Sequence, residues 1–197
     1  MVPGLAGPAV PDDMAPLDAA AGRWMPYVVM DAVHLPAAGR RELPQLIRAL
    51  PQEERSSRFA PKRFGPLTGG PGDWIIRMLR YRNLDWMGMA KTLVVVTPTY
   101  PSAATYGVIG AGRKELTHRL LTDFAALLGV DALELGALTG VLLSEVPRPP
   151  GPDAVDAAAL LWEARRLSAT QAEHVSELAR SMRGDSRGGY LINLPGP

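Results

Sequence analysis

The feature that most limits the fold is a stretch of helical apolar spacing between two segments rich in proline and glycine. The flanking segments are residues 64–72 (FGPLTGGPG) and residues 147–152 (PRPPGP), which cannot continue a helix. Between them, apolar residues recur every three or four positions, and capping residues or glycines interrupt the pattern at short intervals. Residues 73–146 are therefore predicted to form an all-α bundle of short helices.

Five helices are expected in this bundle. Four residues of the types that cap helix N-termini precede apolar runs: Asp73, Asp85, Ser102 and Thr117. A fifth helix is predicted over residues 132–139, where Gly140 ends the pattern. Residues 94–101 (VVVTPTYP) are β-branched and contain two prolines, so they predict an extended segment or a loop between the second and third helices.

The N-terminal part of the chain has less regular patterns. Residues 1–22 are rich in Pro, Ala and Gly and are predicted to be a disordered tail. Residues 23–72 are expected to be an N-terminal segment that ends in the first linker. Within it, residues 24–35 fit a strand or a short helix equally well, and residues 41–58 predict a short amphipathic helix.

After the second linker, residues 153–184 predict two amphipathic helices that form a helical hairpin. Ser168 and Gln171 have the spacing of a capping box at the start of the second helix of this hairpin. Residues 185–197 are polar and rich in glycine, and we expect them to form a C-terminal tail.

The composition excludes several classes of site. The chain has no cysteine, so it cannot form a disulfide, a thiolate metal site or a cysteine nucleophile, and a cytoplasmic location is expected. The three histidines are far apart in the sequence and predict no metal site. Neither a signal peptide nor a membrane span is predicted. We therefore expect a non-enzymatic protein without a cofactor.

Charge is distributed unevenly, although the formal net charge is only +1. Residues 73–119 carry seven Lys or Arg against three acidic residues, a balance of +4, whereas residues 120–162 carry one Arg against six acidic residues, a balance of −5. A basic face with an acidic continuation is typical of a DNA-binding region joined to a protein-contact region. Chance variation over windows this short can also produce it.

The order of residues in the bundle resembles the Xre/Cro family of repressor-type helix-turn-helix domains over about a third of the chain. The similarity begins with Arg82-Asn83-Leu84-Asp85 and Met89-Ala90, which resemble the start of the second helix of the family. The segments SAATYGVI (residues 102–109) and GRKEL (residues 112–116) resemble the recognition helix and the basic turn after it. Residues 120–138 resemble the closing helices. The resemblance implies a five-helix DNA-binding transcriptional regulator.

Helix-turn-helix domains place the N-terminal part of the third helix in the major groove, while basic side chains hold phosphates. The resemblance therefore implies base-facing candidates in and before this helix: Thr99, Tyr100, Ser102, Ala103, Ala104, Thr105 and Tyr106. It also implies phosphate-contacting candidates: Arg80, Lys91, Arg113 and Lys114. Double-stranded DNA is the expected partner.

Two departures from the family leave a second interpretation open. Residues 94–101 make the turn about six residues longer than is usual in the family. Residues 102–109 contain no Arg, Asn or Gln, so the bidentate contacts to guanine or adenine are not available there. The alternative is a degenerate helix-turn-helix that binds a protein partner instead of DNA.

A homodimer is expected, because two half-sites on DNA gain affinity when their binding domains are joined. The predicted dimerisation surface is the apolar face of the C-terminal hairpin: Leu161, Trp162, Val175, Leu178 and Met182.

Overall fold

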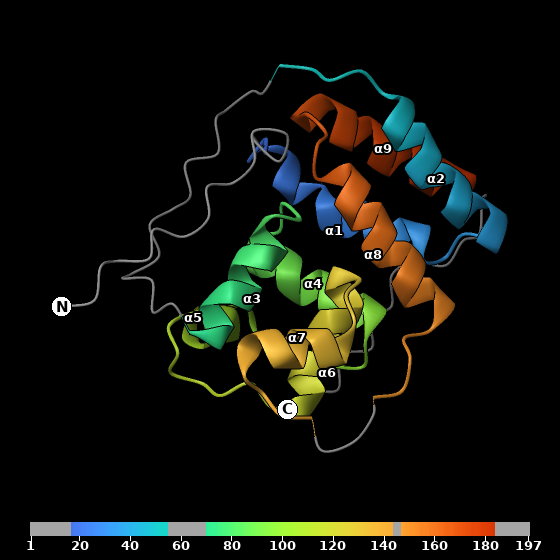
Figure 1. The fold of residues 1–197 in the computed structure, drawn as a ribbon. Coiled ribbons are helices and arrows are strands. Elements are labelled where there is room, and N and C mark those ends of the chain that lie inside the picture. Colours follow the sequence, from blue (N-terminus) through green and yellow to red (C-terminus); the bar gives the residue numbers. More distant parts are fainter. Residues whose placement is uncertain (1–16, 55–69, 144–146, 184–197) are drawn as a thin grey trace, which may run out of the picture.

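The computed structural model describes residues 17–54, 70–143 and 147–183 of the chain. The predictions for residues 1–16, for residues 64–69 of the first linker and for the tail at residues 185–197 lie outside these ranges. In the described part every regular element is a helix and there is no strand, which confirms the all-α class (Figure 1).

The described elements follow one another along the chain as a short 3₁₀ helix and a series of α-helices. They are η2 (Ala21–Arg23), α1 (Met25–Ala32), α2 (Ala37–Ala49), α3 (Pro71–Arg80), α4 (Trp86–Val96), α5 (Ala103–Gly110), α6 (His118–Leu128), α7 (Ala132–Thr139), α8 (Pro152–Ala164) and α9 (Ala169–Met182). No helix among them has both the length and the apolar character needed to cross a bilayer.

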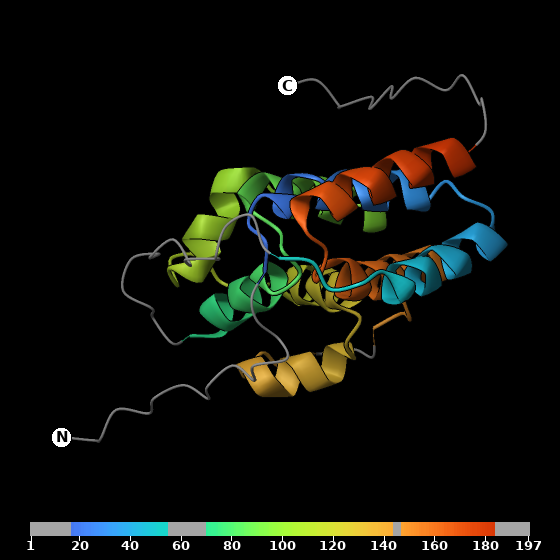
Figure 2. The ribbon, with the colours of Figure 1, turned by 90° about the horizontal axis from the view of Figure 1, so that it is seen from above.

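The helices share one hydrophobic core. Viewed from above, α9, α1, α4 and α5 lie on one side, α2, α8, α6 and α3 lie beneath them, and α7 is outermost (Figure 2). Helix α1 packs against α4 and α9, and α8 packs against α2 and α6. Since one cluster of buried apolar side chains runs from Ala21 to Ala179, the flanking helices complete the core of the central ones.

The C-terminal hairpin, α8 and α9, is therefore an integral part of this core. Leu161 has no exposed surface and Val175 is 5% exposed, so both are wrong as dimerisation residues. Trp162 is half-buried beneath the guanidinium groups of Arg82 and Arg165, whose carbon atoms Cζ lie 4.5 and 3.6 Å from its ring centre. Among the predicted dimerisation residues, only Leu178 is exposed, while Met182 is half-buried.

Residues 17–22 also belong to the folded body, which corrects the predicted boundary of the N-terminal tail. Leu17 and Ala21 are buried, and Asp18 has no exposed surface. Oδ2 of Asp18 accepts a hydrogen bond of 2.9 Å from the main-chain N–H of Ala169, the first residue of α9. The main-chain oxygen of Asp18 accepts another, of 2.8 Å, from Nδ2 of Asn83. This segment thus joins the start of α9 to the loop between α3 and α4.

Local sequence signals place most helix ends. Asp85 and Thr117 cap α4 and α6 through their side chains, and Ser168 forms the predicted capping box with Gln171. Helix α7 has the predicted bounds and ends at Gly140, whose φ of 73° is in the left-handed region that glycine adopts without strain. Helix α3 differs, because it begins at Pro71 and its cap position is Gly70 rather than Asp73.

The prediction for residues 94–101 is wrong in its first three residues. Val94, Val95 and Val96 continue α4, and the loop begins only at Thr97. All three are half-buried, and Val95 and Val96 pack against the core. Tertiary packing here outweighs the preference of β-branched residues for extended structure.

Candidate nucleic-acid interface

The turn between α4 and α5 is ordered by its own threonines. Oγ1 of Thr97 donates a hydrogen bond of 3.0 Å to the carbonyl oxygen of Leu93 and accepts one of 3.3 Å from the main-chain N–H of Thr99. The turn leads into Ser102, which occupies the N-cap position of α5. The Oγ of Ser102 lies 3.0 Å from Oγ1 of Thr105 and caps no main-chain N–H. The first turn of α5 therefore keeps main-chain donors without a side-chain cap.

Helix α5 is held against the bundle by its inner face. Tyr106 and Ile109 have no exposed surface, and the ring of Tyr106 lies 6.0 Å from that of Phe124 on α6. Helix α3 approaches closely, because a Cβ atom added to Gly72 would lie 2.2 Å from the carbonyl oxygen of Ile109. Tyr106 is thus a core residue, and its prediction as a DNA contact is wrong.

The outer face of α5 and the loops at its two ends are open to solvent. Tyr100, Ser102, Ala104, Arg113 and Lys114 are exposed, while Thr99, Ala103 and Thr105 are half-buried. Tyr100 is the most exposed aromatic residue among the large exposed hydrophobic side chains of the described residues, at 57%. The structure therefore brings eight of the predicted residues to α5 and its adjoining loops; we call these eight residues the α5 surface.

Lys91 and Arg80 lie elsewhere. Nζ of Lys91 lies 3.2 Å from the hydroxyl oxygen of Tyr27, so this side chain faces α1. The guanidinium of Arg80 lies 5.2 Å from the ring centre of Trp86, the first residue of α4. Trp86 is about 15 Å from the far end of this helix at a rise of about 1.5 Å per residue. The structure therefore directs these two cations toward Tyr27 on α1 and toward Trp86 on α4.

Arg119 is a basic residue of this region that the sequence analysis did not single out. It lies in the first turn of α6, and its Nε donates a hydrogen bond of 3.2 Å to Oγ1 of Thr99 in the turn. The same Nε lies 4.0 Å from Oδ2 of Asp123, and the Arg119 side chain remains 69% exposed. The sequence feature that could have identified Arg119 is a basic residue two positions after the helix cap Thr117. Arg119 extends the basic part of the surface from α5 to α6.

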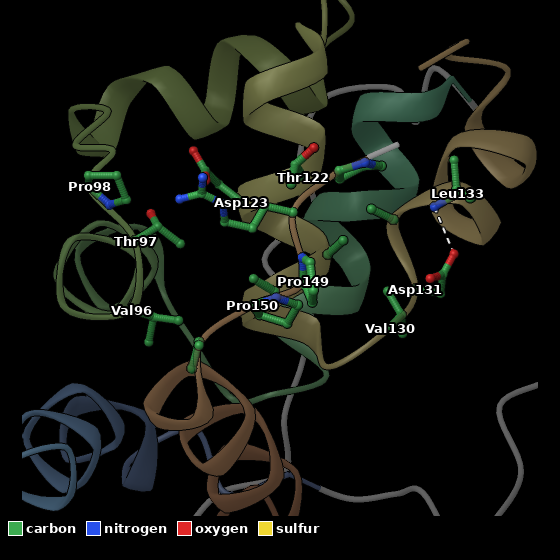
Figure 3. A pocket seen from close by; sticks show the side chains of 17 residues that line it. Val96, Thr97, Pro98, Thr122, Asp123, Val130, Asp131, Leu133, Pro149 and Pro150 are labelled. Carbon is green, nitrogen blue, oxygen red and sulfur yellow. Dashed lines mark hydrogen bonds between the residues drawn. The ribbon is translucent and has the colours of Figure 1, made fainter. Parts of the chain in front are cut away.

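A cavity of about 450 Å³ adjoins the other side of this turn (Figure 3). Its walls are mostly apolar and come from the end of α4, from α6, from the start of α7 and from residues 147–151. In Figure 3, Asp123 extends from α6 toward Thr97 and Pro98, whereas Asp131 lies at the opposite end beside Leu133. Oδ1 of Asp131 is engaged as the cap of α7, where it accepts from the N–H groups of Leu133 and Glu134.

The polar and basic groups of the α5 surface are of kinds that can bind nucleic acid. In the part of the chain that the structure describes, no group of three or more His, Asp or Glu side chains is placed to hold a metal ion. The α5 surface offers hydroxyl groups, an exposed aromatic ring and the cations of Arg113 and Lys114, joined by Arg119. Such groups can donate hydrogen bonds to phosphate oxygens and can contact the edges of bases.

Comparison with known proteins identifies no relative: no family model, no curated protein and no solved structure matches this chain.

Proposed function

We propose that the protein is a DNA-binding transcriptional regulator that holds duplex DNA on the α5 surface. The observation that carries the proposal is the placement of α5: its inner face is fixed by Tyr106 and Ile109, while its N-terminal end and both adjoining loops are exposed. A helix supported in this way can enter a major groove. The sequence of α3 to α7 also resembles a repressor-type five-helix domain.

Exposed cations near α5 provide the electrostatic attraction in the proposed DNA binding. Arg113, Lys114 and Arg119 are exposed near the ends of α5, and cations in such positions neutralise DNA phosphates and release counterions. Base recognition has a different origin, because α5 carries no side chain that makes bidentate contacts. Ala103 and Ala104 suit contacts with thymine methyl groups, and DNA shape supplies the remaining specificity.

A salt titration tests this proposal. We expect the full chain to bind a pool of genomic duplex fragments with an affinity that falls as salt rises from about 50 to 200 mM. The double variant Arg113→Ala and Lys114→Ala is expected to bind more weakly and to lower the salt dependence by about 0.9 per lost phosphate contact. Arg41→Ala is the matched control, since Arg41 is exposed on α2, at the opposite edge of the body from α5 (Figure 2). Equal loss in the control would contradict the assignment.

A second candidate function is binding of a protein partner, and exposed apolar side chains in and beside α7 favour it. Val130, Leu133, Leu138 and Leu142 are exposed, with Leu142 at 87%, and α7 is the outermost helix in Figure 2. Exposed apolar clusters of this kind commonly mark interaction sites. Two results together would support this function over the first: the protein does not bind DNA even at low salt, and it binds a protein partner that the Leu138→Asp variant no longer binds.

A homodimer remains part of the proposal, with different contacts from those expected. Because Leu161 and Val175 are buried in the protomer, the dimer would have to use exposed residues such as Leu178 or the outer face of α7. Light scattering on the full chain measures the oligomeric state. A dimer that persists in Leu138→Asp but not in Leu178→Asp would assign the contact to α9.

A further inference from the structure

A second cavity, of about 600 Å³, lies away from the α5 surface between η2, α1, the first half of α4 and α9. It is distinct from the cavity in Figure 3, because the two share no residue. Its size is within the range of about 300–1,000 Å³ that is usual for sites that bind small molecules. The residues that carry its chemistry are two aromatic and three basic side chains: Trp24, Tyr27, Arg23, Lys91 and Arg180.

The aromatic side chains meet at an angle and carry cations beside them. The rings of Trp24 and Tyr27 lie 6.3 Å apart in an edge-to-face arrangement. The guanidinium of Arg23 lies 5.1 Å from the ring centre of Trp24, and the ammonium of Lys91 lies 4.9 Å from that of Tyr27. Flat apolar surface and positive charge therefore occur together, which suits a molecule that has both an aromatic ring and an anionic group.

The positive charges are only partly compensated. Within residues 17–54, 70–143 and 147–183, neither Arg23 nor Lys91 forms an ion pair with a carboxylate. Arg180 has a partial partner, since its Nε lies 3.9 Å from Oδ2 of the buried Asp31. Three basic side chains thus reach one cavity from η2, α4 and α9.

Two carboxylates line the same cavity, and one of them is already engaged. Oδ1 of Asp85 accepts a hydrogen bond of 2.6 Å from the main-chain N–H of Gly88 and so caps α4. Because Asp85 already caps the N-terminus of α4, binding of an anion in the cavity would depend on the basic side chains and not on this helix end. Glu173 is the other carboxylate, which leaves the lining with one more positive than negative charge.

We propose that this cavity binds a small aromatic anion of the nucleotide class. The ring of the ligand packs on Trp24 and Tyr27, and its phosphate is held by Arg23 and Lys91. This site does not depend on the proposed DNA binding, because none of its basic residues lies on the α5 surface. The cavity lies between α4, α1 and α9. A bound ligand would therefore stabilise the packing of α4, the helix that leads into the α4–α5 turn.

Calorimetric titration of the full chain with adenosine and guanosine 5′-monophosphates tests the site. We expect saturable binding of at least one of them, and at least tenfold weaker binding of adenosine or guanosine and of inorganic phosphate, which each lack one half of the ligand. Lys91→Gln keeps a polar side chain but removes its charge, and it is expected to weaken nucleotide binding about tenfold. Arg41→Ala is the control and should leave this affinity unchanged, because Arg41 is exposed on α2 and does not line the cavity. Thermal unfolding shows whether each variant is folded.

Three results would overturn this assignment. One is the absence of binding of both nucleotides at millimolar concentration, and another is an unchanged affinity in both Lys91→Gln and Arg23→Gln. The third is a Lys91→Gln variant that loses duplex DNA binding while no nucleotide binds, which would make the cavity part of the DNA footprint. Failure of DNA binding with retained nucleotide binding would contradict only the function proposed for α5.

Discussion

Basic side chains have two different environments in this molecule: some are exposed on the surface, and others form ion pairs that hold helices together. Around α5, Arg113 and Lys114 are exposed and form no ion pair within the described residues. Between the flanking helices, arginines are tied to groups far away in the sequence. Arg40 on α2 binds both Asp153 and Asp156 on α8, at 2.7 and 2.8 Å. The difference shows that net charge alone cannot identify a binding surface, because many of the cations hold the fold.

Arg82 shows how far a structural arginine can be drawn into the protein. Its Nη2 donates a hydrogen bond of 2.8 Å to the carbonyl oxygen of Leu128 at the end of α6, and its guanidinium lies against Trp162 on α8. Burial, and to a smaller extent the charge of Arg165, lower the pKa of Arg82 to about 10. The guanidinium still carries its charge at neutral pH, so its role is to join the central helices to the C-terminal hairpin.

The largest effect is expected from Arg183→Ala. Nη1 of Arg183 lies 2.6 Å from Oδ1 of Asp31, which has no exposed surface. Removal of Arg183 takes a close cationic partner from a buried carboxylate, and we expect the free energy of unfolding to fall by about 3 kcal/mol. Urea denaturation measures this change. Asp31→Asn combined with Arg183→Ala should be less destabilising than Arg183→Ala alone, and a greater loss in the double variant would contradict the pairing.

Arg166→Ala is expected to have the next largest effect. Nη2 of Arg166 lies within hydrogen-bonding distance of the main-chain oxygens of Ile47, Arg48 and Leu50, at the C-terminal end of α2. The carbonyl of Ile47 also accepts from the main-chain N–H of Leu50, but Arg166 is a shared donor to all three carbonyls, so we expect a loss of about 2 kcal/mol in the free energy of unfolding. Hydrogen exchange should show the fastest new opening in the last turn of α2. Unchanged protection there would contradict this role.

Local signals in the sequence predicted the central helices well. The predicted residues Asp85 and Thr117 are side-chain caps of α4 and α6, and Gly140 has a positive φ where α7 ends, whereas Ser102 precedes α5 without capping it. These features depend on neighbours within four residues, which a sequence shows directly. For this reason α7 has the predicted bounds, while α3, which begins before its expected cap, is an exception.

Features that depend on distant contacts could not be predicted. Nothing near Asp18 indicates that its carboxylate caps α9, 151 positions later. The apolar side chains of the hairpin suit a core and a dimer interface equally well, and only the position of α1 and α2 shows that Leu161 is in the core. Helix α5 is apolar on all sides, so its pattern could not show that Tyr106 faces inward.

Tyr106→Phe tests the inner face of α5 and should have a smaller effect. The hydroxyl group of Tyr106 is buried and has no hydrogen-bond partner within the described residues. In the folded protein this hydroxyl has lost its hydrogen bonds to water without gaining others. Tyr106→Phe removes that cost, so we expect the free energy of unfolding to rise by about 1 kcal/mol at neutral pH. Burial raises the pKa of this hydroxyl above its usual value of 10.0.

The pH dependence of the same variant gives an independent check. As pH rises above about 10, the tyrosine ionises in the unfolded chain but not in the folded one, so the unfolded state binds fewer protons and stability falls. Tyr106→Phe removes this part of the loss, and the difference between variant and wild type should grow with pH. A difference that stays constant to pH 11 would show that Tyr106 is exposed in solution.

The smallest effect on stability is expected for Arg113→Ala combined with Lys114→Ala. Both side chains are exposed, and surface substitutions away from caps and buried networks change stability by no more than about 0.5 kcal/mol. Urea denaturation at the same salt concentration as for Arg166→Ala gives a direct comparison. A loss near that of Arg166→Ala would place these two cations among the residues that hold the fold. An unchanged midpoint together with weaker DNA binding would separate the binding surface from the structural arginines, since the same loss of charge would then affect one property and not the other.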